Sequence, residues 1–176
     1  FAVLFGGATA LLPIFARDVL GVGEVGFGLL RAAPAVGSVA MSLWLARFGH
    51  FRRAGRALLG AVALFGVSWI AFALSRSFGL SLAILAAGGA LDNVSVVLRS
   101  TLVQMFTPQE KMGRVAAVNG FFIGSSNEIG AFESGLAARL LGVVPSVVLG
   151  GALTLVTVAL VAWRAPELRR LERIGA

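Results

Sequence analysis

Long apolar runs make up almost the whole chain, and short connections that are polar or contain glycine or proline separate them. A helix needs about 20 apolar residues to cross a hydrocarbon core of about 30 Å. Six runs approach that length, and the first of them is short: residues 1–16, 27–46, 57–74, 79–106, 115–138 and 145–163. Because the connections are short, consecutive helices must be antiparallel neighbours. The pattern predicts an all-α fold, a polytopic transmembrane six-helix bundle with essentially no strand.

Composition supports a location in the membrane. Hydrophobic residues make up 58% of the chain, charged residues only 13%, and the mean hydropathy is +0.93, whereas roughly a quarter of the residues in soluble domains are charged. The 23 glycines suit helices that pack closely in lipid. The chain begins at Phe1, inside an apolar run. We therefore expect it to contact the lipid bilayer and to be part of a longer protein.

The residue types that most enzymes need are missing. There is no cysteine and only one histidine, His50, which excludes thiol catalysis, thiolate metal sites, zinc clusters and His-based triads. Neither an HExxH nor a GxSxG motif occurs. We expect no enzymatic activity, no catalytic residue, no cofactor and no metal site. We interpret His50 as an ordinary loop residue.

The basic residues point to membrane topology rather than to nucleic acid, because they lie between apolar runs and form no stripe interleaved with aromatic residues. Ten of them fall on one side of the predicted membrane: Arg47, Arg52, Arg53, Arg56, Lys111, Arg114, Arg164, Arg169, Arg170 and Arg173. Four fall on the other side: Arg17, Arg31, Arg76 and Arg139. By the positive-inside rule the first side is cytoplasmic, and both ends of the chain are cytoplasmic.

Polar residues are concentrated in two of the six predicted spans. Spans 57–74 and 145–163 carry no charge, and we expect them to face lipid. Spans 79–106 and 115–138 contain the candidate residues for a substrate or proton pathway: Asp92, Asn93, Ser95, Arg99, Asn119, Ser126, Asn127, Glu128 and Glu133. An ionisable side chain in hydrocarbon costs about 2.5 to 3.5 kcal/mol on insertion scales. These residues are therefore expected to face water or a partner group.

Helical spacing divides span 115–138 into three faces. The face expected to line water holds Asn119, Ser126, Asn127, Gly130, Glu133 and Ser134. The face expected to meet apolar neighbours holds Val118, Phe122, Ile129 and Leu136. Gly120, Gly124 and Glu128 form a third stripe at four-residue spacing, typical of close helix packing. We therefore expect Glu128 to point at another helix rather than straight into a cavity.

In span 79–106, one face holds Ser81, Gly88, Asp92, Ser95 and Arg99. The helical rise separates Asp92 from Arg99 by about 10 Å in depth, too far for a direct ion pair in a straight helix. This face predicts a polar wall with an acid and a base at different depths.

Each charged candidate has more than one interpretation. Asp92 is either a proton or substrate group or a structural hydrogen-bond partner, and Glu133 either contacts substrate or lies at a solvated rim. Glu128, among apolar residues and glycines, either carries a proton in its neutral form or packs between helices. Arg99 either attracts an anionic substrate or extends toward the cytoplasmic face. Pro34 and the pair Gly88 and Gly89 are either kink points or tolerated helix residues.

Two loop segments carry a resemblance to a known superfamily. The stretch Leu45-Ala46-Arg47-Phe48-Gly49-His50-Phe51-Arg52-Arg53 resembles the Gly, Asp, Arg, Gly, Arg loop of major facilitator superfamily transporters, without its acidic residue. The stretch from Thr107 to Arg114 is similar to the start of helix eleven in that superfamily. The resemblance assigns a loop motif to Arg47, Gly49, Arg52, Arg53, Gly113 and Arg114. It implies that residues 1–176 are the C-terminal six-helix half, helices 7 to 12, of a twelve-helix fold.

Two further strings narrow the resemblance to one branch. Residues 12–21 and 122–130 resemble the enterobactin-exporter-like branch, also called transmembrane secretion effectors. The resemblance implies efflux of a small organic solute, siderophore-like or drug-like, across the plasma (inner) membrane by proton antiport with alternating access. Helices 7, 8, 10 and 11 would line the path, and a missing N-terminal six-helix half would complete it. Asp92, Glu128 and Glu133 are then the candidate proton or substrate groups.

A second hypothesis remains open from the sequence. A non-transporting six-helix membrane scaffold or subunit would show the same apolar runs and the same charge bias. Six further spans upstream of Phe1 would favour the transporter, and a start codon immediately before Phe1 would favour the scaffold.

Overall fold

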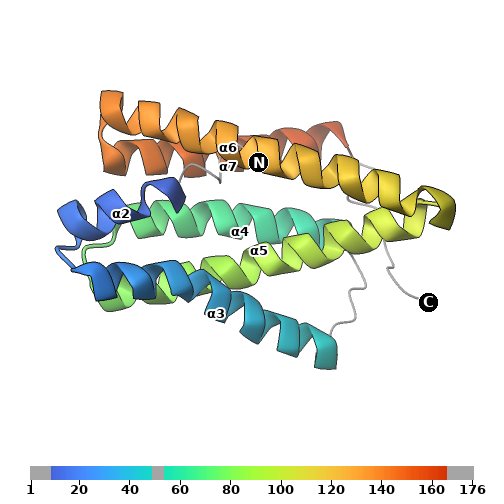
Figure 1. Cartoon of the computed structure of the whole chain (residues 1–176), viewed down its shortest axis with the longest axis horizontal. Helices are drawn as coiled ribbons and strands as arrows, with labels where there is room; N and C mark the ends of the chain where they lie inside the picture. The colour runs from blue at the N-terminus through green and yellow to red at the C-terminus, as the bar shows by residue number, and fades with distance from the viewer. Residues whose placement is uncertain (1–8, 49–53, 166–176) are drawn as a thin grey trace.

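The computed structural model describes residues 9–48 and 54–165, and within these ranges all regular structure is helical (Figure 1). The elements are α2 (Leu12–Ile14), η1 (Phe15–Val19, a π-helix), α3 (Glu24–Phe48), α4 (Ala54–Leu74), α5 (Phe78–Phe106), η2 (Gln109–Lys111, a 3₁₀ turn), α6 (Met112–Leu141) and α7 (Val143–Arg164). The last five predicted spans are confirmed as helices to within three residues at each end. The predicted all-α fold is confirmed.

The first predicted span lies partly outside the described residues. From Thr9 onward it is helical, and the helix continues three residues beyond the predicted end at Ala16, as the π-helix η1 to Val19. Arg17 Nε donates to Asp18 Oδ1 at 2.7 Å near the end of η1, and this hydrogen bond lowers the pKa of the exposed Asp18 carboxyl. Gly21 then reverses the chain direction with a φ of 61°, a conformation that favours glycine.

Four of the described helices are long and apolar enough to cross a membrane: α3, α4, α5 and α7. The 30-residue α6 is not among them, because its many Asn, Ser, Gly and Glu residues lower its hydropathy. Gly142, with a φ of 91°, is the single residue that joins α6 to α7. This tight connection makes α6 an antiparallel neighbour of α7 in spite of its polar content.

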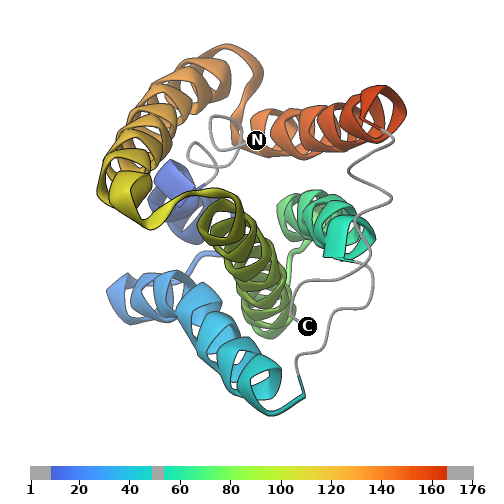
Figure 2. The same cartoon turned by 90° about the vertical axis from the view of Figure 1, so that its right-hand side faces the viewer.

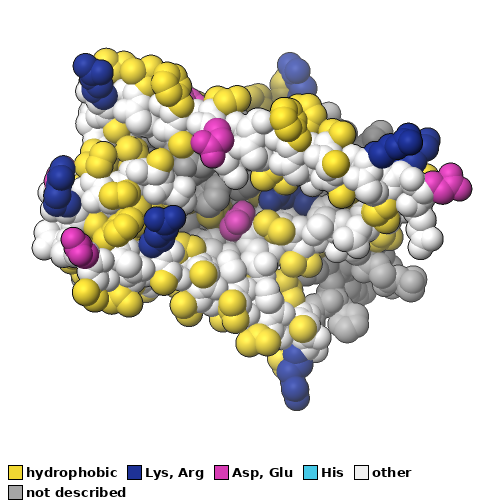
Figure 3. Space-filling view, in the orientation of Figure 1, with side chains coloured by type: hydrophobic (Ala, Val, Ile, Leu, Met, Phe, Trp, Pro, Cys, Tyr) yellow, Lys and Arg dark blue, Asp and Glu magenta, His cyan; other side chains and the backbone are white. Residues whose placement is uncertain are grey.

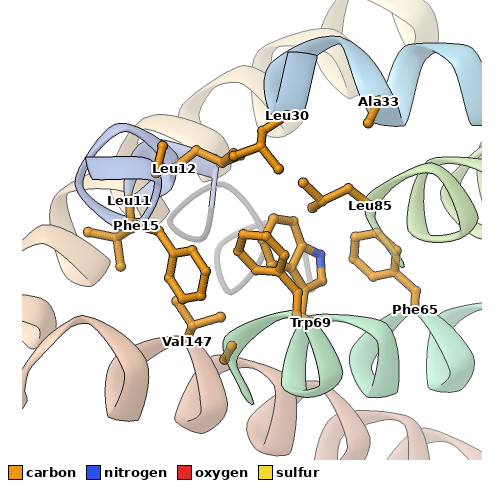
Figure 4. Close-up of a cluster of buried hydrophobic side chains, with 12 residues drawn as sticks. Leu11, Leu12, Phe15, Leu30, Ala33, Phe65, Trp69, Leu85 and Val147 are labelled. Carbon is orange, nitrogen blue, oxygen red and sulfur yellow. The ribbon is translucent and has the colours of Figure 1, made fainter. Parts of the chain in front are cut away.

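The hydrophobic core lies where η1, α3, α4, α5 and α7 meet (Figure 4). Trp69 projects from α4 into the centre of this core, between Leu85 of α5 and Phe15 of η1. Its ring packs edge-on against Phe72 with centroids 5.5 Å apart, and Phe72 packs against Phe15 at 4.4 Å. Aromatic pairs at these separations stabilise a core beyond the area they bury.

The helix α4 packs against α5 on one side and α7 on the other. Its exposed apolar surface is a narrow strip that includes Leu64, Val67 and Leu74. The prediction that span 57–74 faces lipid concerns this strip, whereas other apolar side chains of the helix supply the protein core. For α7, the prediction that span 145–163 faces lipid fits its exposed apolar residues, which include Leu149 and Leu160.

Glycines bring α3 and α5 into backbone contact. A Cβ added at Gly37 of α3 would lie 1.8 Å from the carbonyl oxygen of Ala86, and one at Gly89 of α5 would lie 2.0 Å from that of Pro34. Gly66 and Gly151 bring α4 and α7 together in the same way, with a Cβ at Gly151 lying 2.9 Å from the Gly66 carbonyl oxygen. Pro34 and Gly89 thus have a packing role in the α3–α5 contact. Small residues at such contacts are typical of membrane helices.

Viewed end-on, α2 lies between α3 and α6, and α6 runs along the outside of the bundle (Figure 2). The main helix contact of α6 is with α7. The segment at residues 9–13, the helix α3 and the helix α6 line a common cavity. They are not packed tightly against one another there.

Candidate functional site

Two adjoining cavities lie among these helices. The large cavity, of about 620 Å³, is enclosed by residues 9–13, α3 and α6. The small cavity, of about 130 Å³, lies deeper between α3, α4 and α5. Thr9, Pro34 and Ala35 line both cavities, so the two are neighbours across the N-terminal half of α3. Figure 3 shows an acidic side chain in the hollow between the helices on this face.

The large cavity brings opposite charges together from two helices. Arg31 of α3 lines one side, and Asn127 and Glu128 of α6 line the other. Thr9, Ala10, Leu12 and Pro13 form the end wall. An acid, a base and an amide facing one space can bind a polar solute and can exchange a proton with water.

Arg31 is the functional residue that the sequence reasoning missed. It was counted among the basic residues outside the membrane, but it lies about two turns inside α3 and lines the large cavity. The signal was present in the sequence, because Arg31 falls within the predicted span 27–46. Without Arg31, the charge bias between the two sides is ten basic residues against three.

The faces of α6 differ from those predicted. The stripe of Gly120, Gly124 and Glu128 does not pack against a helix of the described chain: a Cβ at either glycine would meet no heavy atom within 4 Å. Glu128 instead lines the large cavity, beside Asn127. Gly130, which was expected to line water, is the buried residue of α6. The cavity wall therefore combines one residue of the expected water face with one residue of the expected packing stripe.

The other predicted pathway residues of α6 line neither cavity. Asn119 and Glu133 are exposed and Ser126 is half-buried, and none of the three is among the residues that enclose either space. The face expected to meet apolar neighbours is exposed too, as Phe122 at 65% and Ile129 at 58% illustrate. Of the predicted α6 residues, Asn127 and Glu128 remain as cavity groups.

Asp92 of α5 lines the small cavity and is half-buried there. The remaining walls include Phe65 and Trp69 of α4 and Leu85 of α5. The face of α5 predicted as one polar wall is thus divided: Gly88 and Asp92 line the small cavity, whereas Ser81 is buried and donates to Ser75 Oγ at 2.9 Å.

Asn93 has a structural role in the described chain. Its Nδ2 donates to the Ser38 carbonyl oxygen at 3.1 Å and to Ser42 Oγ at 2.8 Å, both on α3. Ser38 Oγ in turn donates to the Gly89 carbonyl oxygen at 2.9 Å. These bonds reinforce the close glycine contact between α3 and α5, and they place Asn93 in a helix interface rather than in a cavity.

Ser95 and Arg99 lie farther along α5 and line neither cavity. Ser95 is 1% exposed, and its hydroxyl oxygen has no hydrogen-bond partner among the described residues. Arg99 Nε donates to the Ser95 carbonyl oxygen at 3.3 Å, one turn back on its own helix. Neither residue is placed to contact a solute in these two spaces.

The loop motif is described only in part. Gly49, Arg52 and Arg53 lie outside the described residues. Arg47 is exposed at the end of α3, and Gly113 and Arg114 are exposed in the first turn of α6. The structure therefore leaves the assignment of this loop motif as a prediction.

The sequence pattern of the transmembrane secretion effectors, a branch of the major facilitator superfamily, matches residues 1–174 of the chain. The chain belongs to this family. Neither a curated protein nor a solved structure matches it. The predicted superfamily and branch are thereby confirmed, and with its apolar helices the chain is an integral membrane protein of a transporter family.

The cavities fit the arrangement that the family implies. The helices that were expected to line the path correspond to the segment at residues 9–13, α3, α5 and α6. Each of them contributes lining residues to at least one of the two cavities. The helix α4 was expected to stay outside, but it contributes Phe65, Ser68 and Trp69 to the small cavity.

Proposed function

We propose that the chain is the C-terminal half of a secondary active transporter that exports a small organic solute in exchange for protons. The observation that carries this proposal is the large cavity, in which Glu128, Arg31 and Asn127 face one space within a strongly apolar helix bundle. Charged groups inside membrane proteins are costly and are typical of solute and proton pathways. The family membership supports secretion as the direction.

In this proposal Glu128 exchanges the coupling proton. When the cavity opens to the outer side, a Glu128 carboxylate oxygen accepts a proton and the solute leaves. When the cavity opens to the cytoplasm, the proton passes to water and the solute binds. A carrier that changes sides only when it holds a proton or a solute exchanges one for the other.

The arrangement of α6 supports alternating access. Its main contact is α7, and a Cβ added at Gly120 or Gly124 would meet no heavy atom within 4 Å. A helix with few packing contacts moves at a lower free-energy cost than α3 and α5, which are held together by the close backbone contact at Gly37 and Gly89. We propose that α6 moves relative to α3 as the cavity changes its opening.

We further propose that both ends of the chain are cytoplasmic and that the membrane is the inner membrane. The excess of basic residues on one side supports this orientation. A cysteine at Arg47, in the last turn of α3, is expected to react with an impermeant thiol reagent from the cytoplasmic side only. A cysteine at Arg76, between α4 and α5, is expected to react from the opposite side only, and reaction of both from one side would contradict the topology.

The function is tested with the full-length protein in inside-out vesicles. A labelled catecholate siderophore and a cationic dye serve as the two probes. We expect uptake of at least one of them when the vesicle interior is made acidic, and loss of that uptake when a protonophore removes the gradient. A folded protein that moves neither probe would favour a non-transporting membrane scaffold or subunit.

A further inference from the structure

The small cavity has the dimensions of a site for one ring or a short alkyl group. Its volume is about 130 Å³, close to an engineered apolar cavity of about 150 Å³ that holds benzene. Phe65, Trp69 and Leu85, which line it, belong to the buried core. The rings of Phe65 and Trp69 meet edge to face, with centroids 6.2 Å apart and planes at 77°. Such walls remove an apolar group from water on several sides.

Three side chains, those of Ser38, Ser68 and Asp92, give this cavity an acceptor character. The Ser38 hydroxyl donates its proton to the Gly89 carbonyl oxygen at 2.9 Å, and the Ser68 hydroxyl donates its proton to the Phe65 carbonyl oxygen at 2.7 Å. Because a hydroxyl has one proton, each of these oxygens can only accept a further bond. The Asp92 carboxylate is also an acceptor when ionised. A ligand group in contact with these three residues must therefore be a hydrogen-bond donor.

The charge of Arg99, farther along α5, acts on Asp92, but no basic side chain of the described residues contributes a donor inside the cavity. Of the described residues that line it, none is Lys or Arg. Arg31 lines the large cavity, and Arg99 lies about 10 Å farther along α5, where it bonds to Ser95. The Asn93 amide nitrogen is bonded to α3. Asp92 is thus the charged group of the small cavity.

We infer that the small cavity binds the apolar end of an organic cation, with its ammonium group on Asp92 and on the two serine oxygens. The aromatic faces of Phe65 and Trp69 add cation–π attraction. The large cavity, which adjoins at Thr9, Pro34 and Ala35, holds the rest of the solute beside Glu128 and Arg31. This inference rests on the proposed function, because it assigns a substrate class to the same path.

Three probes with one ring and different charges test the inference. Benzylammonium, benzyl alcohol and benzoate are titrated by equilibrium dialysis against the purified full-length transporter. We expect benzylammonium to bind at least about tenfold tighter than benzyl alcohol, and benzoate to bind weakest. Equal binding of the ammonium and the alcohol would overturn the inference.

The variant Asp92→Asn keeps the shape of the cavity and removes its charge. It should bind benzyl alcohol as the unmodified protein does, which shows that the cavity is folded, while the preference for benzylammonium disappears. Glu133→Gln, an acid on α6 that lines neither cavity, is the matched control and should keep the full preference. An Asp92→Asn variant that keeps the preference would also overturn the inference.

The two proposals fail in distinguishable ways. A protein that binds benzylammonium through Asp92 but moves neither probe across vesicles would contradict the transport proposal alone. A proton-driven transporter without a preference for the ammonium probe would contradict the cation site alone.

Discussion

At the scale of single residues, glycine and a few polar side chains determine how the helices approach one another. Gly37 and Gly89 allow α3 and α5 to touch through their backbones, and Asn93 adds hydrogen bonds across the same contact. Gly124 has no such neighbour. The same residue type therefore has opposite consequences at different positions, which composition alone cannot reveal.

This difference predicts opposite effects of one substitution. Gly37→Ala places a methyl group against the Ala86 carbonyl oxygen and should destabilise the protein by about 1 to 3 kcal/mol, the usual cost of overpacking. Gly124→Ala, the matched control, meets open space and should be neutral or gain up to about 1 kcal/mol from helix propensity. Thermal unfolding of the detergent-solubilised full-length protein measures both. Equal midpoints for the two variants would contradict the close α3–α5 contact.

The candidate site could be predicted only in part at this scale. Asp92, Asn127 and Glu128 were identified because polar residues interrupt apolar runs, and all three line a cavity. Asn119 and Glu133 interrupt the same run but line none, because polarity does not tell which way a side chain points. Ser38 and Ser68 were missed because a single serine is common in membrane helices, and their roles depend on partners in space.

At the scale of helices, the lengths of the apolar runs predicted five spans to within three residues. The faces were less predictable. Helical periodicity groups residues by angle but does not fix the angle at which the bundle centre lies. On α6 the predicted groups do not match the cavity, since Asn127 and Glu128 come from different predicted faces but line it together, whereas Gly130 is buried. For α4, an apolar sequence did not distinguish the side chains that supply the core from those on the exposed strip.

The corrected direction of α6 makes a prediction for thiol labelling. A cysteine at Asn127 should react with a water-soluble thiol reagent, because this position lines the large cavity. A cysteine at Gly130 should be protected, because this position is buried. The chain has no native cysteine, so other cysteines need to be removed only from the rest of the full-length protein. Reactive cysteines at both positions would instead restore the faces expected from sequence.

At the scale of the whole molecule, two helix pairs that meet closely at glycines form the packed part of the described bundle. These pairs are α3 with α5 and α4 with α7. The cavities lie between this packed part, the segment at residues 9–13 and the loosely held α6. The apolar runs predicted a six-helix bundle, but the cavity arises from the way the helices meet and could not be located from any one of them.

The central claim is that a proton on Glu128 allows the cavity to change sides. The most direct measurement is the labelling of a cysteine at Asn127 from each side of the membrane, in right-side-out and inside-out vesicles without solute, over a range of pH. We predict labelling from both sides at low pH and from one side at high pH. Glu128→Gln, which mimics the protonated carboxyl, should give labelling from both sides at every pH, whereas the control Glu133→Gln should behave as the unmodified protein. A Glu128→Gln variant that keeps the original pH dependence would contradict the account.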